Sequence, residues 1–359
     1  MIKSGSQLAC FSLLAGCLCF STYTFASSQD FTQAYQAYNQ AVTAGDKQQT
    51  VLSAQQAFDL GKKLYGKDSI DTANLSFNLA IALAENKQDS ESQPYFDLTL
   101  DLYKSHYGDE SIELIDPLLT YADKTKDIKL AKSLLSEARD IAQDSEQPIV
   151  YAHTLSDSFN KLVNSKYDKL SVRRYILKAK QIYSENLPSD STLLVNARFD
   201  SANVYLANKK YDKAEVELLE VINQYERLEY SHPYELASHA KLVSLYSLRN
   251  KPEQATEHCI AIGSMKPWSP DQQQTPLYRV NPEYPRSKAI SGTEGMVQLS
   301  FTVDKQGFVI NPEILKSKGG KAFETESIKV LKEWRYAPKF VDGKPVKAES
   351  TVQLDYTLG

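Results

Sequence analysis

The chain has 359 residues, of which 24% are charged and 42% are hydrophobic, a composition typical of a globular protein with room for two or more domains. Its formal net charge is -4, so no global basic field favours nucleic acid as a partner. The five histidines are scattered through the middle of the chain, and none pairs with a cysteine or a carboxylate at metal-ligand spacing. We therefore expect no metal site.

The segment 1–26 has the layout of a secretory signal peptide. A cationic start at Lys3 precedes an apolar run, and the small residues around Ala26 suit a cleavage site. Two alternatives remain open. The stretch that ends at Cys17 resembles a bacterial lipobox, in which Cys17 would be lipidated. The uncharged residues 8–26 also come close to the length that spans a bilayer, and uncleaved they would form an anchor. All three interpretations place the rest of the chain outside the cytoplasm.

Residues 31–265 are predicted to form an array of helical repeats, because they carry almost no strand pattern and because Ala, Leu and Tyr recur at helical spacing. The clearest repeat is 197–223, and the segment 240–267 is similar to it. Tyr205 and Tyr246 occupy equivalent positions, which gives a period of about 40 residues. This alternation of small and aromatic residues is typical of tetratricopeptide (TPR) repeats.

Two earlier units repeat a Tyr-Gly pair, at 65–66 and 107–108, where glycine is expected to end a helix and the following Asp or Ser to cap the next one. We expect about six helix pairs, of which the pair in 149–187 has the weakest pattern. The bulk of the repeated Ala and Tyr side chains should pack helices together, and some should line the groove that stacked repeats form for a partner. The residues predicted for packing or for the groove are Ala202, Tyr205, Tyr211, Ala214, Tyr246 and Ala255.

A Pro/Gln-rich linker is predicted at 266–275, because proline prevents a continuous helix. From 276 to 359 the apolar residues alternate instead. A hairpin of two strands turns at 304–307, where Gly307 supplies a positive φ. Its first strand places Val297, Leu299, Phe301 and Val303 on one face.

The return strand from Val309 is expected to be interrupted at Pro312. An amphipathic helix follows in 321–336, with Phe323, Ile328, Leu331 and Trp334 toward the sheet. A last strand over 350–358 ends the chain. The predicted fold class is therefore mainly α, a TPR-like α-solenoid followed by a small α+β domain with β-β-α-β order and an antiparallel sheet.

The C-terminal segment resembles the C-terminal domain of the TonB family over roughly 276–358. The residues that carry the resemblance are Tyr284-Pro285, Glu294-Gly295-x-Val297, Phe301-x-Val303-Asp304, Gly307-x-Val309, Ser317, Phe323, Trp334-Arg335-Tyr336-x-Pro338 and Asp342-Gly343-x-Pro345-Val346. The resemblance implies that the domain binds the TonB-box peptide of an outer-membrane receptor by pairing it with the last strand. It would then take part in energy-coupled transport of siderophore-bound iron or a similar substrate. The implied contact residues are Tyr284, Pro285, Ser350, Val352, Leu354 and Tyr356.

The chain departs from energised members of that family at its N-terminus. Residues 1–30 contain no histidine to face a proton-driven motor, and the helical repeats replace the Pro/Lys-rich spacer. In one hypothesis the C-terminal domain binds the receptor while the repeats dock the inner-membrane motor or another TonB protein. In the other, the chain is a non-energised periplasmic TPR scaffold whose last domain binds peptides generally or forms a homodimer.

Neither hypothesis involves catalysis. The sequence has no Gly-x-Ser-x-Gly motif, no phosphate-binding loop and no paired His/carboxylate cluster, so we expect neither an enzyme nor a cofactor. The expected location is the periplasm of a Gram-negative bacterium, with the chain free, lipidated or anchored to the inner membrane.

Overall fold

The computed structural model describes residues 28–225, 232–265 and 274–358. The predicted signal peptide or anchor at 1–26, the lipidation site Cys17 and most of the linker 266–275 lie outside the described residues. The chain divides into two compact units, Met1–Asn186 and Leu187–Gly359, and the boundary falls within the predicted repeats. Across the residues that the structure describes, no helix is both long enough and apolar enough to cross a membrane.

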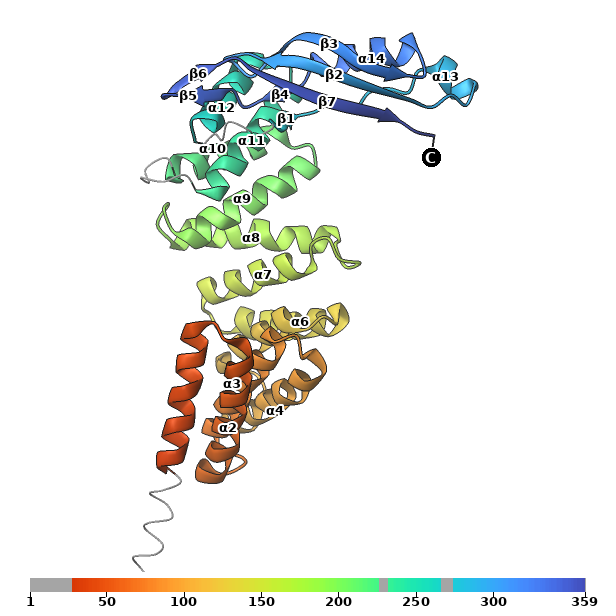
Figure 1. Ribbon diagram of the computed structural model, residues 1–359. Coiled ribbons are helices and arrows are strands. Elements are labelled where there is room, and N and C mark those ends of the chain that lie inside the picture. The colour runs from red at the N-terminus through yellow and green to blue at the C-terminus, as the bar shows by residue number, and fades with distance from the viewer. Residues whose placement is uncertain (1–27, 226–231, 266–273, 359) are drawn as a thin grey trace, which may run out of the picture. The chain divides into compact units, whose positions relative to one another are not determined.

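The first unit is entirely helical in its described part, and consecutive helices contact one another along it (Figure 1). Its elements are a helix over residues 28–44, α2 (Lys47–Tyr65), α3 (Ile70–Glu85), α4 (Asp89–Tyr107), the short 3-10 helix η1 (Ile112–Leu114), α5 (Ile115–Lys124), α6 (Ile128–Asp144), α7 (Pro148–Leu162) and α8 (Leu170–Asn186).

The two Tyr-Gly pairs end helices as the sequence predicts. Gly66 follows α2 with a φ of 93°, and Gly108 follows α4 with a φ of 94°, a conformation that glycine adopts without a steric penalty. The serine that follows the first pair, Ser69, caps α3, because its side chain accepts a hydrogen bond from the backbone N–H of Thr72 at 3.1 Å. Ser111, at the equivalent place, makes no such bond, and the chain begins a 3-10 turn there.

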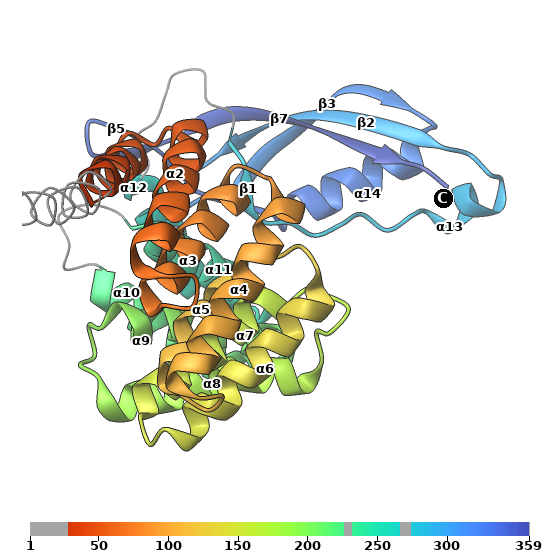
Figure 2. The same ribbon diagram turned by 90° about the horizontal axis from the view of Figure 1, so that it is seen from below.

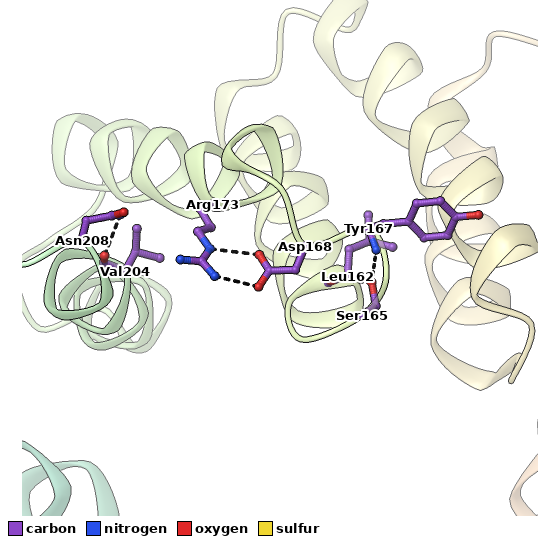
Figure 3. A network of polar contacts seen from close by, with 7 residues as sticks. All are labelled: Leu162, Ser165, Tyr167, Asp168, Arg173, Val204 and Asn208. Atoms are coloured by element: carbon purple, nitrogen blue, oxygen red, sulfur yellow. Dashed lines mark hydrogen bonds and ion pairs between the residues drawn. The ribbon is translucent and has the colours of Figure 1, made fainter.

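The pair α7–α8 exists, although its pattern in the sequence is weak. Asn164 has a φ of 63°, a positive φ that residues following several other helices, such as Lys209 and Asn250, also adopt. Ser165 accepts a hydrogen bond from the N–H of Tyr167 at 3.1 Å, and Asp168 holds Arg173 of α8 through bonds of 3.0 and 2.9 Å (Figure 3). Local polar contacts thus replace the glycine signal that ends α2 and α4.

The second unit begins with two helix pairs that repeat each other closely. The pairs are α9 (Thr192–Ala207) with α10 (Tyr211–Tyr225) and α11 (Pro233–Leu248) with α12 (Pro252–Met265). After α9 the N–H of Lys210 donates to the carbonyl of Tyr205 at 2.8 Å, and after α11 the N–H of Lys251 donates to the carbonyl of Tyr246 at 2.8 Å. The residue before each lysine is left-handed. The repeat inferred from the two tyrosines is therefore present in the backbone.

A small α+β domain completes the second unit. Its strands are β1 (Pro276–Tyr278), β2 (Gly295–Val303), β3 (Val309–Lys318), β4 (Arg335–Tyr336), β5 (Lys339–Val341), β6 (Lys344–Val346) and β7 (Ala348–Tyr356), and its helices are α13 (Arg286–Ile290) and α14 (Lys321–Leu331). The main sheet is antiparallel with the order β3-β2-β7, and α14 covers one face of it (Figure 2). The predicted fold class is confirmed, because helical repeats precede an antiparallel α+β domain.

The apolar residues of β2 predicted to share a face do so. Val297, Leu299, Phe301 and Val303 are all buried in the core beneath α14. The predicted turn also forms, with Gly307 at a φ of 84°. The core is closed by Phe323 and Leu331 of α14 and by Leu354 of β7.

Three details of the predicted domain are wrong. Pro312 does not interrupt β3, because the irregular pairing with β2 at this point accommodates both the proline and Asn311, whose φ is 50°. Helix α14 ends at Leu331, so Trp334 is buried beyond the helix and precedes the short strand β4. The last strand ends at Tyr356, and Leu358 is exposed beyond it.

Candidate functional site: the outer edge of the C-terminal sheet

Strand β7 forms one edge of the three-stranded sheet (Figure 1). It pairs with β2 without any shift in register, from Gly295 opposite Tyr356 to Val303 opposite Ala348. Since the sheet order is β3-β2-β7, no strand of the described chain lies on the outer side of β7. The edge therefore presents backbone donors and acceptors that an extended peptide can pair with.

The ladder geometry indicates which residues of β7 face outward with their backbone groups. At the turn between β2 and β3, the N–H of Asp304 donates to the carbonyl of Phe308 at 2.9 Å, so the backbone of Asp304 faces β3. Donor direction alternates along an antiparallel strand, so the odd-numbered residues of β2 face β7 and bond to their even-numbered partners there. The backbone groups left at the outer edge then belong to Glu349, Thr351, Gln353 and Asp355.

The other edge of the sheet is much less suited to pairing. The pairing of β3 with β2 shifts register twice, and Pro312 has no N–H to donate. Lys316 and Lys318 add exposed charges toward its end. Irregular pairing, proline and lysine are features that protect an edge strand from further pairing. Strand β7 has none of the register shifts of β3 and is therefore the edge better suited to pairing with a peptide.

The four residues of β7 predicted to contact a peptide occupy two different environments. Leu354 and Tyr356 are 1% and 3% exposed and belong to the core. The Tyr356 hydroxyl lies 2.8 Å from the hydroxyl of Ser327 on α14, and burial raises its pKa. Ser350 and Val352 are half-buried, so an added strand could cover their remaining surface. The sequence alternation identified the face of each residue but not its depth.

The predicted contact Tyr284 is used inside the domain. Its hydroxyl donates to the carbonyl of Thr293 at 2.8 Å, and its ring meets the edges of the rings of Phe323 and Tyr356, with centroids 5.5 and 6.0 Å away. Pro285 precedes α13, and its carbonyl accepts hydrogen bonds at the start of that helix. Tyr284 therefore holds the segment before β2 against the core, whereas Pro285 begins α13.

The domain is joined to the last repeat by a buried arginine of β4, which sequence analysis did not single out for this role. The Arg335 guanidinium donates to the Thr256 hydroxyl of α12 at 2.9 Å and to the Gln306 carbonyl at 3.1 Å, and it lies 3.7 Å from the sulfur of Cys259. It also stacks 3.8 Å above the ring of Phe308. Burial raises the pKa of the Cys259 thiol to about 11, so the thiol is neutral near pH 7.

Two glycines allow this joint to close. A Cβ on Gly263 of α12 would lie 2.5 Å from the Pro338 carbonyl oxygen. A Cβ on Gly307 would lie 2.1 Å from the Tyr336 carbonyl oxygen within the domain and 3.2 Å from the Cβ of Cys259 across the joint. The joint has its own hydrophobic core, whose buried members come from both sides. The last helix pair contributes Val243, Cys259 and Ile262, and the C-terminal domain contributes Ala337. The repeats and the domain thus share a core despite the linker between them.

The residues predicted for the repeats lie mostly between helices. Ala202, Ala214 and Ala255 are fully buried. Tyr246 is buried as well, and its hydroxyl donates to Glu215 at 2.9 Å. Tyr205 and Tyr211 are half-buried against the same cluster. Of the two predicted roles, packing between helices and lining a groove, these residues therefore have mainly the first.

A surface cleft of about 530 Å³ lies beside this cluster. Its lining includes Leu206, Tyr211, Lys241 and Leu248. Leu277 of β1 also lines it, and the Leu277 carbonyl accepts a hydrogen bond from Ser244 at 3.0 Å. The chain's own segment therefore takes up part of the space beside α11.

The structure also brings together two histidines that the sequence analysis treated as isolated. His239 of α11 and His258 of α12 face each other with their Nδ1 atoms 2.8 Å apart. Burial lowers the pKa of each to about 4. Among the described residues, no group of three or more His, Cys, Asp or Glu side chains is placed to hold a metal ion. The sequence would have predicted this pair only if the faces of α11 and α12 that pack together had been known, because each histidine points toward the other helix.

Comparison with known proteins shows which proteins the C-terminal domain is similar to. Residues 280–358 match the family model described as Gram-negative bacterial TonB protein C-terminal. Over 80 residues the chain is 31% identical to Protein TonB of Vibrio cholerae, covering 22% of this chain and 33% of that protein. It is 38% identical over 69 residues to Protein TonB of Escherichia coli K12, covering 19% and 27% respectively. The chain thus spans a third or less of the TonB proteins it matches.

Solved structures resemble the two parts of the chain separately. The solution structure of the Pseudomonas aeruginosa TonB C-terminal domain is 28% identical, with a TM-score of 0.22, and the match covers 25% of this chain and 90% of that one. Over the helical part, the Pseudomonas aeruginosa protein described as pilF is 11% identical, with a TM-score of 0.46, and the match covers 68% of this chain and 95% of that one. The family model and the curated relatives show that the segment 280–358 is similar to TonB C-terminal domains, and the structure shows helical repeats before it.

Proposed function

We propose that this chain is a periplasmic, TonB-like binding protein without catalytic activity, which captures an extended peptide of an outer-membrane receptor on β7. The peptide adds a strand to the sheet, and the repeats dock a second protein of the energy-coupled transport system. The similarity of residues 280–358 to TonB C-terminal domains supports this role.

The observation that carries the proposal is the contrast between the two sheet edges. Strand β7 offers a straight edge in unbroken register, whereas β3 is irregular and carries a proline. Backbone pairing along a whole strand resists a pull along the peptide, because several hydrogen bonds share the force. Side chains would then decide which peptide binds.

The joint to α12 is consistent with a role in transmitting force. A domain held on a flexible linker would take up a pull by extending the linker. Here Arg335 and the shared core connect the domain directly to the last repeat. A pull on β7 is therefore passed to the helical array.

The second candidate function is a non-energised scaffold, and the observation that favours it is the internal role of Tyr284. In this interpretation the Tyr284-Pro285 segment only closes the domain, as its contacts with Thr293 and Phe323 suggest. The two functions differ in whether β7 binds receptor peptides.

The test measures binding of TonB-box peptides from the host's receptors to the full-length chain by isothermal titration. The informative variant is Gln353→Pro, which removes an N–H from the outer edge while the ladder to β2 keeps its bonds. The matched control is Gln353→Thr, which loses the same side chain but keeps the N–H.

We expect saturable binding that Gln353→Pro weakens at least tenfold and that Gln353→Thr leaves within about twofold. Circular dichroism should show that both variants are folded. If no peptide binds at millimolar concentration, receptor engagement through β7 is refuted and the scaffold function is favoured.

A further inference from the structure

The solvent-facing side of the C-terminal sheet carries its charges in an ordered way. The strand register shows which residues lie side by side across the three strands. Lys318 of β3 pairs with Met296 of β2, and Met296 pairs with Asp355 of β7. In the same way, Thr302 of β2 pairs with Glu349 of β7. On this face β3 contributes Lys316, Lys318 and one acid, Glu313, whereas β2 contributes uncharged side chains and β7 contributes only acids as its charged residues.

Strand β7 has no basic residue of its own, and Lys347, which lies directly before the strand, forms no ion pair with Glu349 in the described structure. Glu349, Thr351, Gln353 and Asp355 are all exposed, and within the described residues neither Glu349 nor Asp355 forms an ion pair. The Asp355 carboxylate accepts a hydrogen bond from Gln353 at 2.9 Å, which leaves its charge in place. Lys318 is two strands away, about 10 Å, where salt screens most of its attraction.

We propose that the peptide bound on β7 carries Lys or Arg opposite Glu349 and Asp355 and that acidic residues at those two places are rejected. This selectivity rests on the function proposed above. The two acids are six residues apart, so a paired strand would present its two basic residues at i and i+6 on the outward face. In a sheet, opposite charges on directly opposed residues attract and like charges repel.

On the opposite side of the sheet, which α14 covers, the side chains of the bound peptide should be of a different type. Ser350 and Val352 are half-buried on that side, and the ring of Tyr284 lies against Tyr356 nearby. Small apolar side chains would cover the exposed part of Val352 without bringing a polar group of the peptide into this surface. The preferred ligand is therefore an extended peptide with small apolar residues inward and basic residues at two outward positions.

The test uses three fluorescent peptides that share the same apolar inward residues and differ only at the two outward positions, which are both Lys, both Gln or both Glu. Their binding to the full-length chain is measured by fluorescence anisotropy at low and high salt. Opposed charges on a sheet surface correspond to about 1.5- to 5-fold in affinity for each pair. We expect the order Lys, then Gln, then Glu, with smaller differences at high salt.

Charge reversal supplies the decisive variants. Glu349→Lys with Asp355→Lys should invert the order of the three peptides, whereas Glu313→Lys, an acid-to-lysine change on the same face of β3, should preserve it. Equal affinity for all three peptides would overturn the charge selectivity and leave strand pairing intact. Absence of binding by any peptide, the Gln peptide included, would overturn the proposed function itself.

Discussion

Arg335 of β4 and Thr256 of α12 are 79 residues apart in sequence, yet the guanidinium donates to the threonine hydroxyl at 2.9 Å. The same guanidinium lies in the Trp-Arg-Tyr stretch by which the sequence resembles TonB C-terminal domains. In this chain the arginine reaches out of its domain and into the last repeat. The C-terminal domain is therefore held directly by the last helix pair of the second unit.

Replacing Arg335 with Met should loosen this joint. The change leaves the Gln306 carbonyl and the Thr256 hydroxyl without their buried donor, at a cost of about 2–4 kcal/mol. Hydrogen exchange measured by mass spectrometry should show faster exchange in α12 and β4. Arg279→Met is the matched control, because Arg279 is an exposed arginine that stacks on Trp334 from outside. Equal protection of α12 in both variants would contradict the role of Arg335.

Gly263→Ala should destabilise the joint although alanine favours helices. Alanine in place of glycine stabilises an exposed helix interior by about 1 kcal/mol. At Gly263 the added Cβ would lie 2.5 Å from the Pro338 carbonyl oxygen and 2.8 Å from the Phe340 ring, which forces the domain away from α12. We expect a net loss of about 1–3 kcal/mol in urea unfolding. Ser264→Ala, at the adjacent exposed position, should lose less than about 0.5 kcal/mol.

Tyr284→Phe separates an internal role of this residue from contact with a peptide. The variant removes only the hydrogen bond from the hydroxyl to the Thr293 carbonyl, and the ring contacts remain. We expect about 1 kcal/mol less stability and unchanged affinity of the peptide that binds β7. A tenfold loss of affinity with unchanged stability would show instead that the hydroxyl contacts the ligand.

Much of the fold could be predicted from the sequence because local signals agree with the tertiary structure. Gly66 and Gly108 mark helix ends, and the alternation from Val297 to Val303 sets the buried face of β2. The pair α7–α8 lacks the Tyr-Gly signal, because Asn164 follows α7 where glycine follows α2 and α4. The sequence could not show that Pro312 is tolerated, because that depends on the shifted register between β3 and β2.

The candidate site was only partly accessible from the sequence. Strand β7 was found from its alternation, but the core depth of Leu354 and Tyr356 depends on α14, which covers them. The joint through Arg335 and the contact between His239 and His258 were missed for another reason. Both are side-chain contacts between separate elements, and no periodic pattern along the chain encodes which helix faces meet.

The buried histidine pair should make the last repeat sensitive to acid. In the unfolded chain a histidine has a pKa near 6.5, whereas His239 and His258 have pKa values of about 4 in the fold, chiefly because they are buried. Between pH 6.5 and 4 the unfolded state therefore binds more protons, so stability falls as the pH falls, by up to about 1.4 kcal/mol per pH unit for each group. Above pH 6.5 both states are neutral at these residues and this contribution is constant.

Removing one imidazole should reduce this dependence. His258 lies between His239 and Tyr246, whose ring is parallel to it at 5.6 Å. We expect His258→Gln to be less stable than the wild type at pH 7.5 and to lose less further stability on going to pH 5. The control is His106→Gln, a change at an exposed histidine of α4, which should follow the wild-type curve. Urea midpoints at both pH values provide the measurement, with unfolding of the second unit followed by hydrogen exchange in α11 and α12. Because Asp200 of α9, whose pKa is raised to about 6 by burial, changes stability in the opposite direction, the comparison between variant and wild type is decisive. An equal change of midpoint between pH 7.5 and pH 5 in His258→Gln and in the wild type would contradict the role of the pair.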